Sequence, residues 1–250
     1  MPVLLLTGCG GHTPPKHVSA QVQSPAASPT PAPTAIPTPS STPEPSATPK
    51  TPKTPKTPKP SKKPTKHEKV VYLTFDDGPD PRWTPKVLKV LDAHDAHATF
   101  FELGAAANSY PGLVKKVRAS GSVVGSHTWH HYDLTRLSNH GIDSEMQSTD
   151  RVLGSDVRCM RPPYGATSDR VRTRLRNSGY RQVLWDVDPR DWSRPGSKAI
   201  EKRVLDAVKP GSVVLMHDGG GDRSQSVAAL EVILENLDAR GYKVEPIPGC

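Results

Sequence analysis

Short apolar runs rich in β-branched and aromatic residues alternate with amphipathic stretches from residue 69 to the end of this 250-residue chain. The runs have the length of β-strands, and the stretches between them repeat apolar residues at helical intervals. Strict alternation of strands and helices is typical of a parallel sheet covered by helices. The pattern therefore predicts an α/β fold, either an open doubly wound sheet or a barrel. We expect strands over residues 70–75, 98–104, 123–126, 159–162, 181–187, 212–217 and 242–247.

The six stretches between these strands carry local signals for helices. The third repeats apolar residues at helical spacing between Ile142 and Leu153, and the last does so between Val227 and Leu237. Such spacing places the apolar side chains on one face, which can pack against a sheet. Expected starts are marked by Thr84 with Pro85, by Ser168 and by Ser197, and expected ends by Gly121, Gly179 and Gly241.

The N-terminal part of the chain has a different composition. Of the 28 prolines, 17 lie before residue 69, and residues 12–68 are otherwise mostly Thr, Ser, Ala and Lys. Such a segment cannot bury enough apolar surface to offset the entropy of ordering. We therefore expect a disordered tether over residues 12–68 and one folded domain over residues 69–250, a length that supports a sizeable core.

Most of the positive charge lies in this tether. Eight Lys and two Glu fall in residues 12–68, so the tether contributes +6 of the net +8. The nearly neutral domain that remains argues against nucleic acid as the ligand. Four Thr-Pro-Lys units over residues 48–59 favour an extended, positively charged spacer. We expect this spacer either to meet an anionic cell wall or to act only as a solubilising linker.

Residues 1–11, MPVLLLTGCGG, contain a short apolar run that ends in Cys9. This run is similar to the lipobox of bacterial lipoproteins, where the cysteine is lipidated. It lacks the charged start and longer apolar core of an export signal, so either the natural start lies upstream or the match is accidental. We expect an exported protein that is anchored to the membrane through Cys9 or secreted. No other stretch approaches the ~20 apolar residues that span a bilayer.

Two further cysteines, Cys159 and Cys250, lie in the expected domain. In an oxidising compartment they form a candidate disulfide. Two unpaired thiols are the alternative.

Ionisable side chains follow five of the seven expected strands. Parallel α/β folds collect functional groups at this carboxyl edge. Each segment alone has a structural explanation, such as an aspartate that caps a turn, but their convergence on one edge indicates an enzyme. The segments are residues 76–78 (DDG), 127–131 (HTWHH), 161–164 (RPPY), 188–192 (DPRDW) and 215–218 (LMHD).

The second segment suggests a metal site. His127 and His131 are four residues apart, a spacing that places both imidazoles on one face if the segment is helical. Two His and one Asp leave open positions on a metal, as in catalytic sites. Zinc is the default ion, and non-haem iron is the alternative for the same ligand set. A second carboxylate acting as base and a further His acting as acid would make the reaction a hydrolysis.

In order, the five segments resemble the motifs of the polysaccharide deacetylases, carbohydrate esterase family 4. The resemblance covers essentially all of residues 69–250 and implies a distorted (β/α)7 barrel. It implies that Asp77, His127 and His131 bind a divalent metal, which is zinc, cobalt or another divalent ion. It also implies that Asp76 is the catalytic base, and His130 occupies a variable position of its motif.

The resemblance assigns the other site residues as well. Arg161 would pair with Asp76 and keep it ionised, and the backbone N–H of Tyr164 would stabilise an oxyanion. Asp191 would favour the protonated form of His217, the general acid. The walls of the acetyl pocket would be Tyr164, Trp192 and Leu215.

The implied substrate is an acetylated glycan. A basic tether behind a lipobox-like cysteine favours N-acetylglucosamine in peptidoglycan, and chitooligosaccharides and O-acetylated xylan are the alternatives. We expect a monomer. The hypothesis from another class is a wall glycan-binding protein without turnover, which would have lost Asp76 or a metal ligand, and all of these residues are present.

Overall fold

The computed structural model describes residues 69–250. The predictions for residues 1–11 with Cys9, and for the tether over residues 12–68, lie outside the described residues. Within the described part, seven strands form one parallel sheet with the order β5-β4-β3-β2-β1-β6, and β7 pairs with β1. The strands are β1 (Lys69–Asp76), β2 (Thr99–Glu102), β3 (Val123–Ser126), β4 (Cys159–Met160), β5 (Arg181–Gln182), β6 (Val213–His217) and β7 (Tyr242–Val244).

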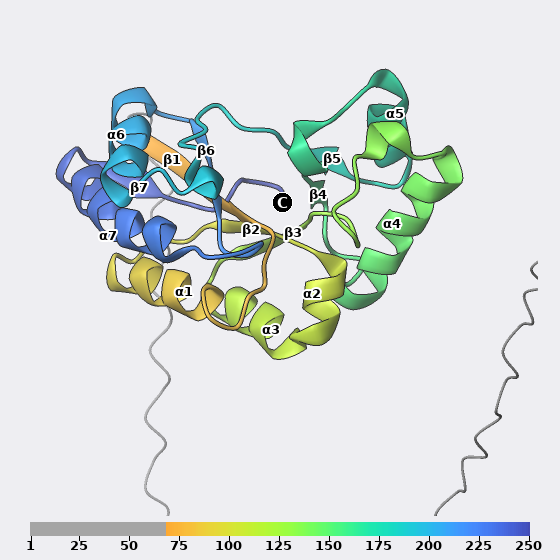
Figure 1. The fold of residues 1–250 in the computed structure, drawn as a ribbon, viewed down its shortest axis with the longest axis horizontal. Helices are drawn as coiled ribbons and strands as arrows, with labels where there is room; N and C mark the ends of the chain where they lie inside the picture. The colour runs from red at the N-terminus through yellow and green to blue at the C-terminus, as the bar shows by residue number, and fades with distance from the viewer. Residues whose placement is uncertain (1–68) are drawn as a thin grey trace, which may run out of the picture. The chain divides into compact units, whose positions relative to one another are not determined.

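Seven α-helices connect these strands and lie around the outside of the sheet (Figure 1). The sequence predicted six, because the connection between β2 and β3 was read as one helix. It contains two, since Pro111 starts a new helix and cannot continue the preceding one. The helices are α1 (Thr84–Ala93), α2 (Gly104–Ser109), α3 (Pro111–Ala119), α4 (Asn139–Leu153), α5 (Asp169–Asn177), α6 (Ser197–Ala207) and α7 (Ser224–Ala239).

The strand order decides between the two architectures that the sequence left open. Strands β5 to β1 follow one another in space, and β6 lies on the other side of β1. An isolated parallel bridge from Val187 to Val214 then connects the segment after β5 to β6. The sheet therefore closes on itself through one bridge, which makes it a distorted barrel in a single α/β domain.

Five strands, β2 and β4 to β7, are shorter than predicted, and β4 and β5 are reduced to two residues each. β4 ends at Met160, because Pro162 and Pro163 lack the N–H groups that a ladder needs. β5 ends at Gln182, and the chain that follows leaves the ladder before the bridge at Val187. Both of these two-residue strands lead directly into loops of the candidate site.

The helix signals are confirmed in part. The Ser168 hydroxyl accepts a hydrogen bond from the Val171 N–H, as expected of an N-cap. Ser197 and Thr84 are instead the first residues of α6 and α1. Gly196 is the N-cap residue of α6, with φ 95°, and because glycine has no side chain, no side chain caps that helix. The three glycines expected after helix ends all have positive φ, at Gly121, Gly179 and Gly241.

Strand β1 lies at the centre of the core. It pairs with β2, β6 and β7, and its Leu73 and Phe75 are almost completely buried. The rings of Phe75 and Phe100 stack with centroids 5.1 Å apart. The opposite side of the core is formed by α7, whose Leu230 and Leu234 are fully buried. The residues that end β1 therefore project from a rigid part of the molecule.

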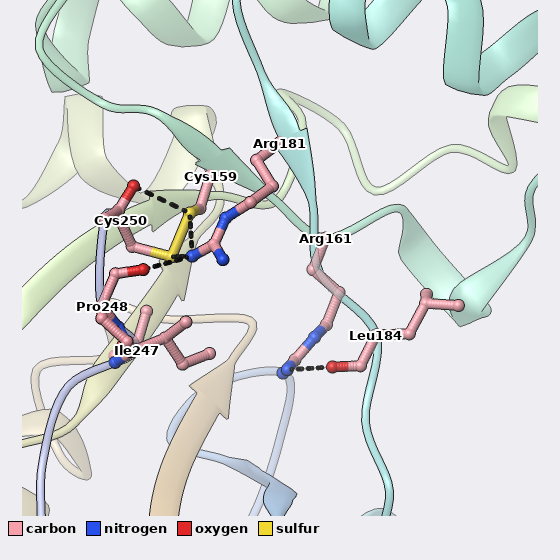
Figure 2. The surroundings of a disulfide bond; sticks show 9 residues. Cys159, Arg161, Arg181, Leu184, Ile247, Pro248 and Cys250 are labelled. Atoms are coloured by element: carbon pink, nitrogen blue, oxygen red, sulfur yellow. Dashed lines mark hydrogen bonds between the residues drawn. A yellow bond between two sulfur atoms is a disulfide. The ribbon is translucent and has the colours of Figure 1, made fainter. Parts of the chain in front are cut away.

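A disulfide joins Cys159 of β4 to Cys250, the last residue (Figure 2). This confirms the first of the two sequence alternatives. Arg181 lies against the bond and donates a hydrogen bond to the Pro248 carbonyl at 2.7 Å.

Among residues 69–250, no helix combines the length and apolar character needed to cross a bilayer.

Candidate active site

One carboxylate and two imidazoles converge where β1 and β3 end. The Oδ1 atom of Asp77 is 3.5 Å from Nε2 of His127 and 3.2 Å from Nε2 of His131. This oxygen is buried and has no hydrogen-bond partner among the described residues. A buried polar atom without a partner costs free energy, so three converging ligand atoms of this kind fit a divalent cation.

Each of the two imidazoles is oriented by a contact at its other ring nitrogen, Nδ1. His127 Nδ1 donates a hydrogen bond to the Arg161 carbonyl oxygen at 2.7 Å, because a carbonyl oxygen can only accept. His131 Nδ1 lies 3.1 Å from the Tyr164 hydroxyl. Burial lowers the pKa of His127 to about 3, so its imidazole is neutral at physiological pH. The Nε2 lone pair of His127 therefore faces the carboxylate, and Nε2 of His131 lies next to the same Asp77 oxygen, as in sites of metal-binding histidines.

These histidines are not presented by a helix, the condition on which the argument from their spacing depended. Residues 127–133 form a loop, in which Thr128 and His131 have φ values of 70° and 63°. The loop brings the rings of His127 and His131 to a centroid distance of 4.9 Å. A left-handed residue that is not glycine costs energy and is often found at functional sites. The ligands therefore meet through loop geometry.

A buried acid that the sequence analysis missed holds this loop. Both Trp129 and His130 donate their backbone N–H to Oε2 of Glu145, at 2.9 and 2.8 Å. The His130 ring is bonded to the other oxygen at 2.7 Å. Glu145 lies on α4, and the apolar periodicity of that helix gave no sign of a polar role at this position. His130 consequently points away from the cluster, in agreement with its assignment to a variable position.

The second carboxylate, Asp76, is paired as expected. Arg161 is fully buried and donates from Nη1 to Asp76 Oδ1 at 2.7 Å and to Thr74 Oγ1 at 2.7 Å. Its Nη2 donates to the Leu184 carbonyl (Figure 2), and the guanidinium lies 4.2 Å from the Phe101 ring centroid. This cation therefore holds the Asp76 carboxylate in one orientation.

The electrostatic balance at Asp76 differs from the expectation. Burial raises its pKa, and the neighbouring Arg161 lowers the pKa by less, so the net pKa lies above the usual value of 3.8. The family resemblance implied the pairing with Arg161, but the sequence did not reveal the extent of burial. A raised pKa makes the Asp76 carboxylate a stronger proton acceptor, as a general base requires.

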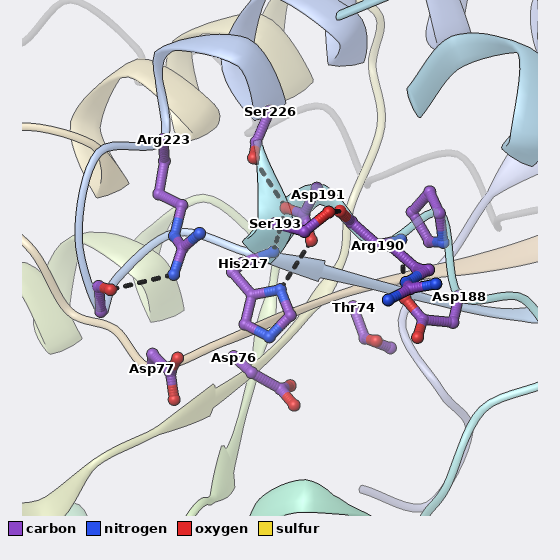
Figure 3. Close-up of polar contacts among 12 residues, drawn as sticks. Thr74, Asp76, Asp77, Asp188, Arg190, Asp191, Ser193, His217, Arg223 and Ser226 are labelled. Atoms are coloured by element: carbon purple, nitrogen blue, oxygen red, sulfur yellow. Dashed lines mark hydrogen bonds and ion pairs between the residues drawn. The ribbon is translucent and has the colours of Figure 1, made fainter. Parts of the chain in front are cut away.

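On the other side of the cluster, Asp191 holds His217 through two hydrogen bonds. Asp191 Oδ1 accepts from His217 Nδ1 at 2.7 Å, and Oδ2 accepts from the His217 backbone N–H at 3.0 Å (Figure 3). Ser226 also donates to Oδ2 at 2.7 Å. Burial lowers the pKa of His217, but the hydrogen bond and charge of Asp191, together with the charges of Asp76 and Asp77, outweigh it, so the net pKa is raised. The free Nε2 of His217 is therefore suited to carry and donate a proton.

These groups border a single cavity of about 390 Å³. Leu215 forms a buried part of its wall, and Trp192 and Tyr164 are 47% and 70% exposed at its rim. Tyr164 has φ 61°, a strained conformation in a short turn that faces the cluster. The cavity is lined by Asp76, Asp77, His127, His131, Tyr164, Trp185, Asp188, Trp192, Leu215 and His217.

Trp185 is a wall residue that the sequence analysis did not single out. Its ring lies against Gly165, where an added Cβ would be 2.8 Å from the indole, and 5.6 Å from the Arg161 guanidinium. Trp185 therefore supports both the turn after Tyr164 and the cation that holds Asp76. The available signal was a large aromatic residue shortly before the DPRDW segment.

The fold and these groups define an α/β enzyme with a candidate divalent-metal site. Residues 63–183 match the family model described as polysaccharide deacetylase. The chain is 42% identical over 193 residues to a chitooligosaccharide deacetylase of Sinorhizobium fredii, covering 71% of this chain and 90% of that protein. It is 41% identical over 182 residues to a peptidoglycan-N-acetylglucosamine deacetylase of Bacillus cereus, covering 71% and 85%.

A solved structure also places this fold among the carbohydrate esterases of family 4. The fold is similar to that of a family 4 carbohydrate esterase from Streptomyces lividans in complex with acetate, with a TM-score of 0.66 and 32% identity. The similarity covers 70% of this chain and 91% of that one. The chain therefore belongs to the polysaccharide deacetylase family, carbohydrate esterase family 4.

Proposed function

We propose that this enzyme is a zinc-dependent N-deacetylase of N-acetylglucosamine in peptidoglycan or chitooligosaccharides. One observation carries the proposal. Asp76 and His217, suited to act as base and acid, lie in the same cavity as the cluster of Asp77, His127 and His131. Base, acid and metal ligands in one cavity are the combination that metal-assisted hydrolysis requires.

Asp76 serves as the base. A metal held by Asp77, His127 and His131 would supply Lewis-acid polarisation of the attacking water and of the acetyl carbonyl. Because Arg161 occupies Oδ1 of Asp76, Oδ2 is the atom that accepts the proton of the water. The water oxygen adds to the carbonyl carbon, and the carbonyl oxygen gains the negative charge. The Tyr164 backbone N–H donates a hydrogen bond to that oxygen.

His217 completes the hydrolysis. Its Nδ1 is bound to Asp191, so Nε2 gives its proton to the sugar nitrogen as the carbon–nitrogen bond breaks. The products are acetate and the free amine of the sugar. Leu215, Trp192 and Tyr164 enclose the acetyl methyl group, because the cavity is apolar at these residues.

The glycan is proposed from the relatives and from the expected location. The Sinorhizobium and Bacillus relatives are described as acting on chitooligosaccharide and on peptidoglycan N-acetylglucosamine. The Cys159–Cys250 disulfide supports an oxidising, extracytoplasmic compartment. We place the domain at the cell wall, either secreted or anchored at Cys9, with the basic residues 12–68 directed to anionic wall polymers.

The test is acetate release by the full chain from N-acetylglucosamine oligomers, peptidoglycan and acetylxylan. Each substrate is assayed as purified, after chelator, and after chelator followed by zinc. We expect release from the N-acetylated substrates that chelator abolishes and zinc restores. Release from acetylxylan alone would make the enzyme an O-acetyl esterase. Glycan binding without release, in zinc-loaded protein, would replace the proposal with a binding role.

A further inference from the structure

The loop that follows β6 packs against Asp77 more closely than any side chain would permit. A Cβ added at Gly219 would lie 1.9 Å from the Asp77 carbonyl oxygen, and one at Gly220 would lie 2.6 Å from Asp77 Oδ2. Both distances are shorter than any van der Waals contact. Only glycine at these two positions allows the backbone to reach Asp77, so the loop fixes where this residue lies.

The contact affects the metal site because it gives the two carboxylate oxygens of Asp77 different neighbours. Oδ1 faces the imidazoles of His127 and His131 and has no hydrogen-bond partner among the described residues. Oδ2 is the atom that lies against Gly220. Asp77 itself has φ 70°, a conformation that a non-glycine residue keeps only when its surroundings hold it. The loop therefore sets the direction in which Oδ1 points.

Successive glycines do not hold a loop in one conformation, because glycine populates many backbone states. Arg223 supplies the missing restraint. Its Nε donates to the Gly219 carbonyl at 2.6 Å, and its Nη2 donates to the Gly220 carbonyl at 3.0 Å. One planar guanidinium thus ties the carbonyls of the two glycines that contact Asp77.

The environment of Arg223 is unusual for a cation. Arg223 is only 5% exposed. Within residues 69–250, no ion pair joins it to a carboxylate. Burying a charge is costly unless it is well hydrogen-bonded. A lysine would offer a point charge in place of the fork that reaches two carbonyls at once. The fork geometry explains why an arginine is suited to this position.

We propose that Arg223 is a positioning residue for the metal ligand Asp77, acting through the carbonyls of Gly219 and Gly220. The inference rests on the proposed metal site and adds the residue that aims its carboxylate. Arg223 is neither in the cluster of Asp77, His127 and His131 nor among the residues that line the cavity. Removing its two hydrogen bonds lets the loop move and allows Asp77 Oδ1 to leave the position it shares with the imidazoles.

The experiment measures zinc affinity of the full chain by competition with a chromophoric chelator, without any substrate. Supporting groups of metal ligands typically change affinity by about 10- to 100-fold, and we expect a loss of that size in Arg223→Met. Arg223→Lys should lose less, since its ammonium group can still donate to one of the two carbonyls. Thermal unfolding of each metal-free variant reports whether the fold is intact.

A glycine pair tests the same idea without touching Arg223. Gly220→Ala should weaken zinc binding, because its methyl group meets Asp77 Oδ2. Gly221→Ala is the matched control, since Gly221 also has positive φ but an added Cβ there meets nothing within 4 Å. It should lower stability and retain zinc affinity. This pair remains informative if Arg223→Met fails to fold.

The outcomes separate the inference from the proposed function. If the wild-type protein does not bind zinc, the proposed metal site itself is wrong. Tight binding by wild type together with unchanged affinity in Arg223→Met and Gly220→Ala would overturn the positioning role alone. Equal losses of affinity in Gly220→Ala and Gly221→Ala would also overturn it, because general strain in the loop would then be the cause.

Discussion

Asp76 and His217 are paired in register across the parallel strands β1 and β6. Each residue is the last of its strand, so both side chains stand at the carboxyl edge of the sheet. Neighbouring strands lie about 4.8 Å apart, and this spacing places the proposed base and acid within reach of one substrate. The two residues are far apart in the sequence, and the pairing of β1 with β6 brings them together.

The first prediction concerns this base and acid. Asp76→Asn and His217→Asn should each lower kcat by about 10²- to 10⁴-fold while zinc binding persists, because neither residue is in the cluster of ligands. The side-chain amide oxygen of the Asp76→Asn variant can still accept the Arg161 hydrogen bond, so the fold should be retained. Acetate release and zinc content are measured on the same preparations. Loss of zinc from Asp76→Asn would contradict the assignment of Asp76 as the base.

The metal ligands should behave differently. Asp77→Ala and His127→Ala each remove one of three protein ligands, so zinc binding and activity should be lost together. Zinc content after dialysis, measured by elemental analysis, checks this. The matched control is His130→Ala, whose imidazole bonds to Glu145 and should leave the zinc content unchanged. A zinc content like that of wild type in Asp77→Ala would refute the ligand assignment.

The dependence of activity on pH should reveal the contact between Asp191 and His217. The general acid must be protonated, and the bond to Asp191 raises the pKa of His217. Activity should therefore persist to higher pH than an ordinary histidine allows, and fall as pH rises through this raised pKa. Asp191→Asn removes the charge, so the alkaline limb of kcat/KM should move to lower pH. An unmoved limb would mean that another group sets it.

Ser226→Ala should shift the alkaline limb less than Asp191→Asn does. Ser226 donates to the Asp191 oxygen that also accepts the His217 backbone N–H. Its loss leaves the carboxylate charged, so the limb should stay closer to that of wild type than in Asp191→Asn.

The disulfide should contribute measurably to stability. It joins residues 91 positions apart and ties the C-terminus to β4. Removing a native disulfide from a small secreted domain typically costs about 2–5 kcal/mol, and we expect Cys250→Ser to lower the free energy of unfolding by that amount. Urea unfolding checks it. Wild type in reductant should match the variant, and an undiminished stability in both would show that the bond adds nothing.

The boundary at residue 69 predicts the effect of a truncation. Residues 12–68 lack the apolar side chains of a core, so deleting residues 1–68 should leave the melting temperature and the activity on soluble oligomers close to those of the full chain. Calorimetry and acetate release check this. A large drop in melting temperature would mean that the N-terminal part contributes to the folded domain.

Much of the site follows from local sequence. Apolar periodicity located all seven strands, and Asp76, His127 and His217 were expected at strand ends because parallel strands direct their carboxyl ends to one edge. Polar residues next to strong strand signals, such as the DDG and HTWHH segments, gave the candidate groups, and the resemblance to the deacetylase motifs gave their roles as base, acid and ligands. Both features depend on residues close in the chain, so the sequence can reveal them.

The tertiary structure decided the rest. Closure into a barrel depends on the bridge between Val187 and Val214, and periodicity contains no information on pairing across such distances. The loop conformation that unites His127 and His131 depends on left-handed residues and on Glu145. The net pKa of Asp76 depends on burial by the whole domain, which outweighs its ion pair with Arg161. The sequence determined which chemical groups are available, and packing between distant segments determined their orientation and charge.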